Sequence, residues 1–355
     1  MDWTTTLTTL LAGRDLTAGQ SVWAMSQIVQ GEVTPVRLAA YLVALRAKGE
    51  TAAEVAGAAD ALLAHAVPVE VAGPAVDIVG TGGDGTGAVN ISTMAAIVVA
   101  ATGLTVVKHG GRAASSTSAG SGDVIEHLGI PLNLLPEHAA KVAEQAGIVY
   151  LFAPAFHTGM KHAGPVRREL GVPTIFNVLA PLINPARPAH QLVGVADPRF
   201  LPVLADVLAA RGCQALVVRG DDGLDKLSTG TTSQVIEVRD GQVRRGVLDP
   251  ARYGIARSAP GALRGGDAAA NAATVHALLD GKPGPVRDAV LLNAAAACAT
   301  TDGGDLDDRI AAALVRCADA VDTGAAATTL RRWIDASTPA AGSARRGEVA
   351  HQLRT

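Results

Sequence analysis

Aromatic residues and cysteines are scarce in this chain. Phenylalanine, tryptophan and tyrosine account for 3% of the 355 residues, whereas 48% of the chain is hydrophobic and much of that is alanine. We therefore expect a core in which helices pack closely on small side chains. Cys213, Cys298 and Cys317 lie far apart and lack the spacing of a metal or redox motif. We interpret them as buried thiols in a reducing cytoplasm.

Other absences narrow the class of partner. No apolar run reaches the roughly 18 residues that span a bilayer, and the N-terminus lacks the charged and apolar regions of a secretion signal. The net charge is -3 and there is no basic block or arm, so nothing indicates nucleic-acid binding. We therefore expect a cytoplasmic protein with no membrane and no nucleic acid among its partners.

The first 66 residues carry apolar side chains at helical spacing. Helices are predicted over 21–29, 35–47 and 51–64. Thr34 precedes a proline at a first helical position, and Thr51 with Glu54 resembles a capping box. Helices without strands predict a separate helical subdomain, which residues 67–74 link to the rest.

From residue 75 onward strands and helices alternate, a pattern typical of a largely parallel sheet. Around Asp240-Gly241 two alternating runs, 234–239 and 242–248, predict a hairpin. The other strands are expected near 76–79, 104–108, 149–152, 191–195 and 214–219. The helices are expected near 91–102, 121–128, 136–146, 199–211, 267–279, 285–299, 306–320 and 324–336.

A glycine-dense loop between the first strand and its helix dominates residues 77–93. Glycines let a ligand approach the backbone, and a helix start near Asn90 offers free N–H groups and a positive dipole end. Together these features favour an anion site, most naturally for phosphate. Asn90, Ser92 and Thr93 add donors, and Asp84 is placed to reach a ribose hydroxyl or a metal-bound water. The alternative is a glycine-rich turn without a ligand.

A second polar segment, residues 106–116, follows the next expected strand. It places Lys108, His109 and Arg112 beside paired glycines and two serines. In open α/β sheets, ligands bind at the carboxyl ends of the strands. A solvated basic turn is the alternative, but two such loops one β-α-β unit apart favour a shared polyanion site.

These two segments resemble the anthranilate phosphoribosyltransferase family of the tryptophan pathway. The resemblance extends in order and spacing from the N-terminal helices to about residue 335. Nucleoside phosphorylases share the architecture but have a different phosphate-loop pattern. The stretches that carry the resemblance are 80–85, 90–93, 108–112, 152–157, 166–171, 184–186 and 220–225.

The resemblance implies an α/β fold, with a small all-helical domain and a large α/β domain around a mostly parallel central sheet. It implies a small domain of residues 1–70 plus about 164–190. The large phosphoribosyl-binding domain would comprise 73–163 and 191–336, and 337–355 would be a flexible tail. Substrates would lie between the two domains, and the family is usually a homodimer joined through the small domain.

The implied reaction transfers the 5-phosphoribosyl group from phosphoribosyl pyrophosphate (PRPP) to the amine of anthranilate and releases pyrophosphate. Catalysis then means holding the ribose, neutralising the leaving group and aligning the amine in an oxocarbenium-like transition state. A divalent ion, normally Mg²⁺, would bridge pyrophosphate oxygens.

Site residues follow from the resemblance position by position. The residues that match PRPP-binding positions are Gly80, Gly83, Asp84, Asn90, Ile91, Ser92, Thr93, Lys108, Arg112, Ser115, Ser116 and Ser121. The residues that match acceptor-binding positions are Gly80, His109, Gly111, Pro154, His157, Met160, Arg167 and Ala180. Ser92 and Asp225 match metal-binding positions, with Lys226 where the family has glutamate.

Two of these assignments have specific alternatives. Arg167 matches the arginine that receives the acceptor's carboxylate, a role suited to a planar bidentate donor; the alternative is a surface charge. His109 is the candidate catalytic residue, because it or His157 is placed to relay the amine proton. The alternative for either histidine is a hydrogen-bonded structural residue.

The chain also departs from the family pattern. Gly111 replaces an asparagine, Ala180 and Ile183 replace glycine and threonine, and Ala88 replaces a threonine. One extra residue lies within 118–123. These changes leave three interpretations: neutral drift in an anthranilate enzyme, transfer to a different aromatic acceptor in specialised metabolism, or a non-catalytic relative that only binds phosphoribosyl ligands.

The lysine at 226 has two interpretations of its own. The family's acidic pair normally binds magnesium, and Lys226 removes one ligand and adds a positive charge beside Asp225. The ammonium group either contacts pyrophosphate directly in place of the ion or weakens one metal site.

Overall fold

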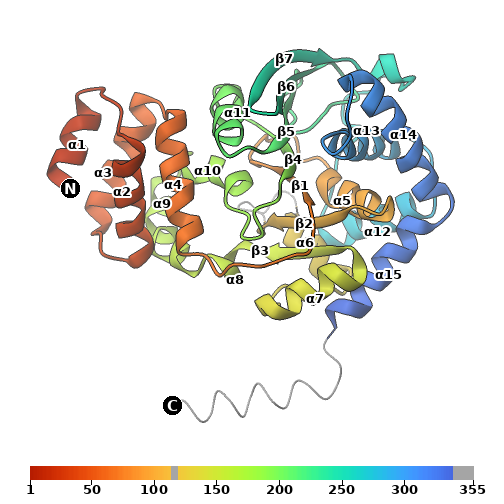
Figure 1. The fold of residues 1–355 in the computed structure, drawn as a ribbon, viewed down its shortest axis with the longest axis horizontal. Coiled ribbons are helices and arrows are strands. Elements are labelled where there is room, and N and C mark those ends of the chain that lie inside the picture. Colours follow the sequence, from red (N-terminus) through yellow and green to blue (C-terminus); the bar gives the residue numbers. More distant parts are fainter. Residues whose placement is uncertain (113–118, 339–355) are drawn as a thin grey trace, which may run out of the picture.

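Four helices form the N-terminal end of the molecule in this computed structural model, which describes residues 1–112 and 119–338 (Figure 1). Thr34 caps its helix ahead of Pro35, and the capping box of Thr51 and Glu54 forms as predicted. An additional first helix, capped by Asp2, was not predicted separately. The four helices are α1 (Trp3–Leu11), α2 (Ala18–Gln30), α3 (Pro35–Lys48) and α4 (Ala52–Ala64).

A seven-stranded sheet forms the centre of the remaining structure, in the order β3-β2-β1-β4-β5-β6-β7. The first five strands are parallel, and the last two complete an antiparallel hairpin whose turn holds Asp240 and Gly241 at positive φ. The mostly parallel sheet and the hairpin are thus confirmed. The strands are β1 (Ala75–Gly80), β2 (Thr105–Gly110), β3 (Ile148–Phe152), β4 (His190–Gly194), β5 (Gln214–Gly220), β6 (Ser233–Arg239) and β7 (Gln242–Leu248).

The strand order reverses between β1 and β4. From β1 the chain first builds outward through β2 and β3, and then returns to add β4 on the other side. Gly80 of β1 pairs with Gly194 of β4 at the carboxyl ends of both strands. Such a reversal leaves a crevice beyond the strand ends, where ligands of open α/β sheets bind.

Helices cover both faces of the sheet. Side chains alternate between the two faces along each strand, and the strands carry apolar side chains on both faces that must be buried. Leu192 and Leu216 belong to the cluster with α5, α7 and α13, whereas Val193 and Val217 belong to the cluster with α11. The helices of the first cluster are α5 (Ile91–Ala101), α6 (Ser121–His127), α7 (Pro136–Ala146), α12 (Ala268–Leu279), α13 (Pro285–Ala299), α14 (Leu306–Asp322) and α15 (Ala325–Ser337). Opposite them lies α11 (Phe200–Ala210), close to α4 (Figure 1).

The segment between β3 and β4 packs against the N-terminal helices. Ala163, Ile175 and Leu179 are buried in the same cluster as Met25 of α2 and Leu62 of α4. This contact supports, as a proposal, the assignment of residues 164–190 to the small domain. The segment contains α8 (Ala153–Phe156), η1 (Thr158–His162), α9 (Gly164–Leu170), α10 (Phe176–Leu179) and η2 (Ala180–Leu182); a further short helix, η3 (Pro250–Tyr253), follows β7.

Two further findings bear on the site. β2 extends to Gly110, beyond the predicted end at residue 108, so Lys108 and His109 lie within a strand and are each 1% exposed. A solvated basic turn is therefore the wrong description of these two residues. Across the described part of the chain, no helix is long and apolar enough to cross a membrane.

Candidate active site at the carboxyl ends of β1, β2 and β4

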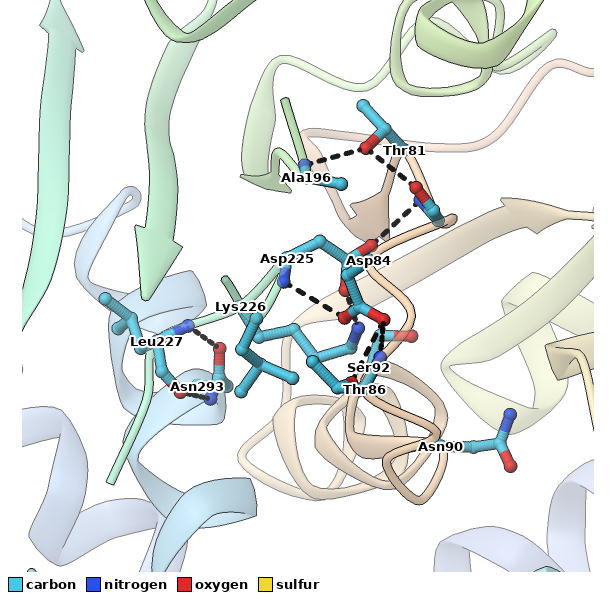
Figure 2. A network of polar contacts seen from close by, with 12 residues as sticks. Thr81, Asp84, Thr86, Asn90, Ser92, Ala196, Asp225, Lys226, Leu227 and Asn293 are labelled. Atoms are coloured by element: carbon cyan, nitrogen blue, oxygen red, sulfur yellow. Dashed lines mark hydrogen bonds and ion pairs between the residues drawn. The ribbon is translucent and has the colours of Figure 1, made fainter. Parts of the chain in front are cut away.

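The glycine-rich loop leaves β1 in a conformation that glycine favours. Gly82, Gly83, Gly85 and Gly87 have φ values of 69°, 75°, 70° and 62°, in the left-handed region. Asp84 braces the loop: its Oδ1 accepts from the Thr86 backbone N–H at 3.0 Å and its Oδ2 from the Asp225 N–H at 3.2 Å (Figure 2). The carboxylate of Asp84 thus ties the loop to residue 225.

Lys108 is held beneath this loop. Its Nζ donates to the carbonyl of Ile78 at 2.7 Å and to Ser92 Oγ at 3.2 Å. Burial lowers its pKa to about 8, although Asp77 counteracts this effect. Asp77 is itself buried, and burial raises its pKa to about 6 against the charge of Lys108. Asn184 fixes Asp77 by donating to its Oδ2 at 2.9 Å.

The start of α5 faces the loop with Ser92. Of the two other predicted donors, Asn90 is engaged elsewhere, and the Thr93 hydroxyl has no hydrogen-bond partner among the described residues. Asn90 donates to the Ala119 carbonyl at 2.9 Å and accepts from Asn271 at 2.7 Å, and Figure 2 shows its side chain turned away from Asp84 and Ser92. Thr93 is fully buried. In the first turn of α5 the N–H groups of Ile91 and Thr93 bond to the carbonyls of Val89 and Asn90, at 2.7 and 3.0 Å. Among the described residues the N–H of Ser92 has no such partner, so it and the positive dipole end of α5 are available to an anion.

The predicted site residues that follow β2 lie only partly beside the glycine-rich loop, Lys108 and Ser92. Arg112 makes ion pairs with Asp123 at 2.9 Å and with Glu126 at 2.8 Å, and 45% of its side chain is exposed. Ser121 lies at the start of α6, within 3.1 Å of the Tyr150 hydroxyl. Ser115 and Ser116 lie outside the described residues.

The segment 225–227 closes the corner between β1 and β4. A Cβ on Gly80 would overlap the Asp225 carboxylate, and one on Gly194 would overlap the Asp225 carbonyl oxygen. Asn293 of α13 holds Leu227 with two hydrogen bonds of 3.0 Å (Figure 2). Its side-chain oxygen accepts from the Leu227 N–H, and its side-chain nitrogen donates to the Leu227 carbonyl. The close packing fixes Asp225 at the strand ends.

The donor set at this corner does not fit a resident divalent metal. The Asp225 carboxylate accepts from Gly82 N–H at 2.8 Å and pairs with the ammonium of Lys226. Among the described residues, no three His, Cys, Asp or Glu side chains are grouped to hold a metal ion. Ser92 Oγ, the neutral oxygen beside Asp225 and Lys226, already accepts from the ammonium group of Lys108 at 3.2 Å.

Two histidines meet on the other side of β2. His109 contacts the Ala180 carbonyl through Nδ1 at 3.2 Å, and His157 contacts the Ile183 carbonyl through Nε2 at 2.8 Å. Because a carbonyl only accepts, each contacting nitrogen must carry the proton. Burial lowers the pKa of His109 to about 3 and lowers that of His157 as well, so both rings are neutral.

Arg167 lies on α9, ten residues after His157 in the sequence, and its guanidinium lies 4.9 Å from the ring centroid of Phe176. It is half-buried, burial lowers its pKa, and no ion pair to it is found among the described residues. Met160 is partly buried against the apolar cluster that contains Met25 and Leu62, and Pro154 is exposed. No atom of the described residues lies within 4 Å of a Cβ placed on Gly111.

Sequence reasoning missed three residues that organise the site. Asp77 and Asn184 support Lys108, and Asn293 holds the segment after Asp225. Two of them left a signal in the sequence. Asp77 is a charged residue inside an apolar strand, and Asn293 is a polar residue inside an alanine run. Buried polar groups of this kind need partners, which is why they mark internal networks.

Comparison with known proteins agrees with this arrangement. Residues 4–66 and 72–327 match, respectively, the helical bundle domain and the a/b domain of the glycosyl transferase family. An anthranilate phosphoribosyltransferase of Saccharopolyspora erythraea is 55% identical over 338 residues, covering 95% of this chain and 96% of that relative.

Solved structures give the same result. The anthranilate phosphoribosyltransferase of Thermus thermophilus has a TM-score of 0.87 and 39% identity, over 94% of this chain and 99% of that one. The Saccharomyces cerevisiae enzyme in complex with PRPP and Mg has a TM-score of 0.85 and 28% identity, over 94% of this chain and 97% of that one. The chain therefore belongs to the anthranilate phosphoribosyltransferase family.

Proposed function

We propose that the chain transfers the 5-phosphoribosyl group from PRPP to the amine of anthranilate and releases pyrophosphate, a step of tryptophan biosynthesis. One observation carries the proposal: the buried Lys108 lies below a glycine-rich loop and the start of α5, at the reversal of the sheet. Relatives over nearly the full length are anthranilate phosphoribosyltransferases, and the yeast relative was solved with PRPP and Mg and with 4-fluoroanthranilate.

The donor half of the site binds the phosphates. The loop backbone, the Ser92 N–H with the positive dipole end of α5, and the ammonium of Lys108 supply positive charge where negative charge develops on the departing pyrophosphate. Ser92 lines a small cavity at the corner between β1 and β4 together with Asp225 and Lys226. Stabilising this leaving group lowers the barrier most, since the transition state separates it from an oxocarbenium-like ribose.

The acceptor half holds anthranilate by its carboxylate and its amine. Arg167 is a planar donor without an ion pair among the described residues, so it suits a carboxylate. His109 presents an unprotonated Nε2 that has no hydrogen-bond partner in the described structure. In this proposal Nε2 accepts the proton that the amine loses. His157 and the Ala180 carbonyl hold the His109 ring in position.

The reaction then balances simply. The bond between the anomeric carbon and the pyrophosphate oxygen breaks, and its electron pair leaves with pyrophosphate. The amine lone pair forms the new carbon–nitrogen bond, and the proton lost from nitrogen passes to His109 Nε2 and then to solvent. The low pKa of His109 makes it a weak base, which matches an aryl ammonium ion that is itself acidic.

Magnesium enters this proposal as part of the substrate. When bound to the diphosphate, Mg²⁺ neutralises its charge. Ser92 Oγ, which accepts from Lys108 at 3.2 Å, would be the side-chain oxygen at the start of α5 available to such an ion.

We also propose a homodimer joined through the small domain. Val36 and Val43 are seven residues apart on α3, on one face of the helix, and both are exposed, as is Leu11 of α1. Exposed apolar side chains on neighbouring helices favour a protein contact. Sedimentation of wild type and Val36→Asp tests this: a dimer is expected for wild type and a monomer for the variant.

The test of the function is a steady-state assay with PRPP, Mg²⁺ and anthranilate, which follows anthranilate fluorescence and pyrophosphate release in parallel. A kcat/KM of roughly 10⁴ M⁻¹s⁻¹ or more is expected. Pyrophosphate release with another aromatic amine but not with anthranilate would overturn the assignment of the acceptor. PRPP binding without turnover of any amine would overturn the assignment of an enzyme.

A further inference from the structure

Lys226 lies at the point where the sheet reverses, on a segment with little freedom to move. The preceding residue is clamped between the glycines that end β1 and β4, and the following residue is held by Asn293. Ser92, Asp225 and Lys226 line one small cavity at this corner. The ammonium group therefore faces the same space as the start of α5.

Two ammonium groups and two carboxylates meet at this corner. The ammonium group of Lys226 pairs with Asp225, whose backbone N–H donates to Asp84 Oδ2 at 3.2 Å. The ammonium group of Lys108 donates to Ser92 Oγ at 3.2 Å, and Ser92 lines the same cavity as Lys226. Both ammonium groups thus lie beside the start of α5.

The ammonium group of Lys226 has donors to spare. It carries three N–H donors, and within the described residues one hydrogen bond engages it, to Asp225 Oδ1. Its side chain is 17% exposed, compared with 3% for Asp225. The Lys226 side chain thus keeps exposed surface at a corner where Asp225 has almost none.

We propose that Lys226 contacts the diphosphate of PRPP directly, as a fixed cation that makes a divalent ion unnecessary at this corner. The proposal rests on the proposed function for its ligand. A carboxylate at 226 would reverse the charge and, with Asp225, create a pair of acidic oxygen ligands for Mg²⁺. The lysine instead neutralises Asp225 and supplies the positive charge itself, without the need to bind an ion.

The first test measures binding of inorganic pyrophosphate by calorimetry in buffer with EDTA. Lys226→Gln removes the charge but keeps a donor for Asp225, and Lys226→Arg keeps the charge. Lys141→Gln, on the exposed side of α7, is the matched control for loss of one positive charge. We expect affinity to fall about tenfold or more in Lys226→Gln, and to stay near wild type in Lys226→Arg and in Lys141→Gln. Equal affinity of Lys226→Gln and wild type would overturn the proposal.

The second test counts metal ions. Electron paramagnetic resonance of Mn²⁺, with saturating pyrophosphate, gives the ions bound per chain. We expect Lys226→Glu to bind one more Mn²⁺ than wild type, and its pyrophosphate binding to depend more steeply on Mn²⁺. The same stoichiometry in both proteins, with Lys226→Glu shown to be folded by circular dichroism, would overturn the proposal.

The outcomes also separate this inference from the proposed function. Pyrophosphate binding that depends on Lys226, in a chain that does not transfer ribose to anthranilate, would support the role of Lys226 and overturn the proposed acceptor. Turnover of anthranilate with pyrophosphate affinity indifferent to residue 226 would support the function and overturn the inference.

Discussion

The imidazole rings of His109 and His157 meet edge to face, with centroids 5.3 Å apart and planes at 72°. One lies on β2 and the other follows α8, and both bond to carbonyls of the short stretch 180–183. The two rings thus pin this stretch to the sheet. Because both nitrogens that face the carbonyls must donate, neither ring can adopt the other tautomer without losing its bond.

Acid should weaken the fold through these rings. The pKa of His109 is about 3 in the folded protein, below its unfolded value of 6.5, so the unfolded state binds protons first. The stabilisation is complete above pH 6.5 and is lost as the pH falls towards 3. One such histidine should cost about 1 to 1.5 kcal/mol of unfolding free energy between about pH 7.5 and 5.5.

Urea unfolding at several pH values checks this prediction. The variant His109→Asn keeps a donor where Nδ1 lies but cannot titrate, so the pH dependence should flatten by about that amount. His157→Gln, which keeps a donor where Nε2 lies, should flatten it further. Parallel pH profiles for His109→Asn and wild type would refute the assignment.

Pyrophosphate binding should weaken in alkali because of Lys108. Its pKa in the free protein is about 8, and binding requires the ammonium form, so affinity should fall by up to about tenfold per pH unit above that value. Lys108→Met should bind weakly and lack this fall. Calorimetry gives the ratio of the pyrophosphate affinities of wild type and Lys108→Met at each pH. Because the ionisation of pyrophosphate affects both proteins equally, a change in this ratio reports on Lys108. A constant ratio from pH 7 to 9.5 would contradict the prediction.

Arg167 should govern the affinity for anthranilate. Arg167→Lys keeps the charge but loses the bidentate fork, and Arg167→Ala loses both. We expect the KM for anthranilate to rise about tenfold and about hundredfold respectively, with the KM for PRPP unchanged. The neighbouring Arg168 is exposed on the same helix and is the matched control. A similar effect of Arg168→Ala would point to general charge rather than to a carboxylate site.

Gly111 should set the size of the acceptor. Among the described residues nothing lies within 4 Å of the position of its absent Cβ, so we expect Gly111→Asn to fold normally while filling the acceptor side. We expect the variant to lose about tenfold in kcat/KM for ring-methylated anthranilates relative to anthranilate itself. Gly111→Ala should lie between. An unchanged ratio across the three proteins would mean that residue 111 does not contact the acceptor ring.

Gly194 should be intolerant of any side chain. A Cβ there would overlap the Asp225 carbonyl oxygen, whereas one on Gly246 of β7 would meet nothing. Gly194→Ala should lower the unfolding free energy by about 2 to 4 kcal/mol, and Gly246→Ala should change it by less than about 0.5 kcal/mol. Equal denaturation midpoints would show that the segment at 225 moves aside readily.

Much of this fold was predictable because local rules and tertiary packing agree. Thr51 with Glu54 marks a helix start, and Asp240-Gly241 marks a hairpin, through chemistry confined to a few neighbouring residues. The strand order is different. No residue near β1 or β4 in the sequence indicates that these two strands pair. Their pairing depends on how the intervening helices pack against the sheet.

The site was predictable in its residues more than in their interactions. Lys108 was identified, but its dependence on Asp77 and Asn184 was not, because those partners lie 31 and 76 residues away in sequence. Asn90 was expected to face the ligand, yet its amide joins Ala119 and Asn271. A side chain with several possible partners takes those that folding brings closest, and a sequence motif does not reveal them.

The shared core of the N-terminal helices and the segment 163–183 has a consequence for synthesis. α2 and α4 leave the ribosome first, but Ala163, Ile175 and Leu179, which cover part of their apolar faces, follow about a hundred residues later. At ribosomal rates this delay is on the order of ten seconds. The nascent chain therefore presents an uncovered apolar surface to chaperones, and a fragment that stops before residue 163 keeps it.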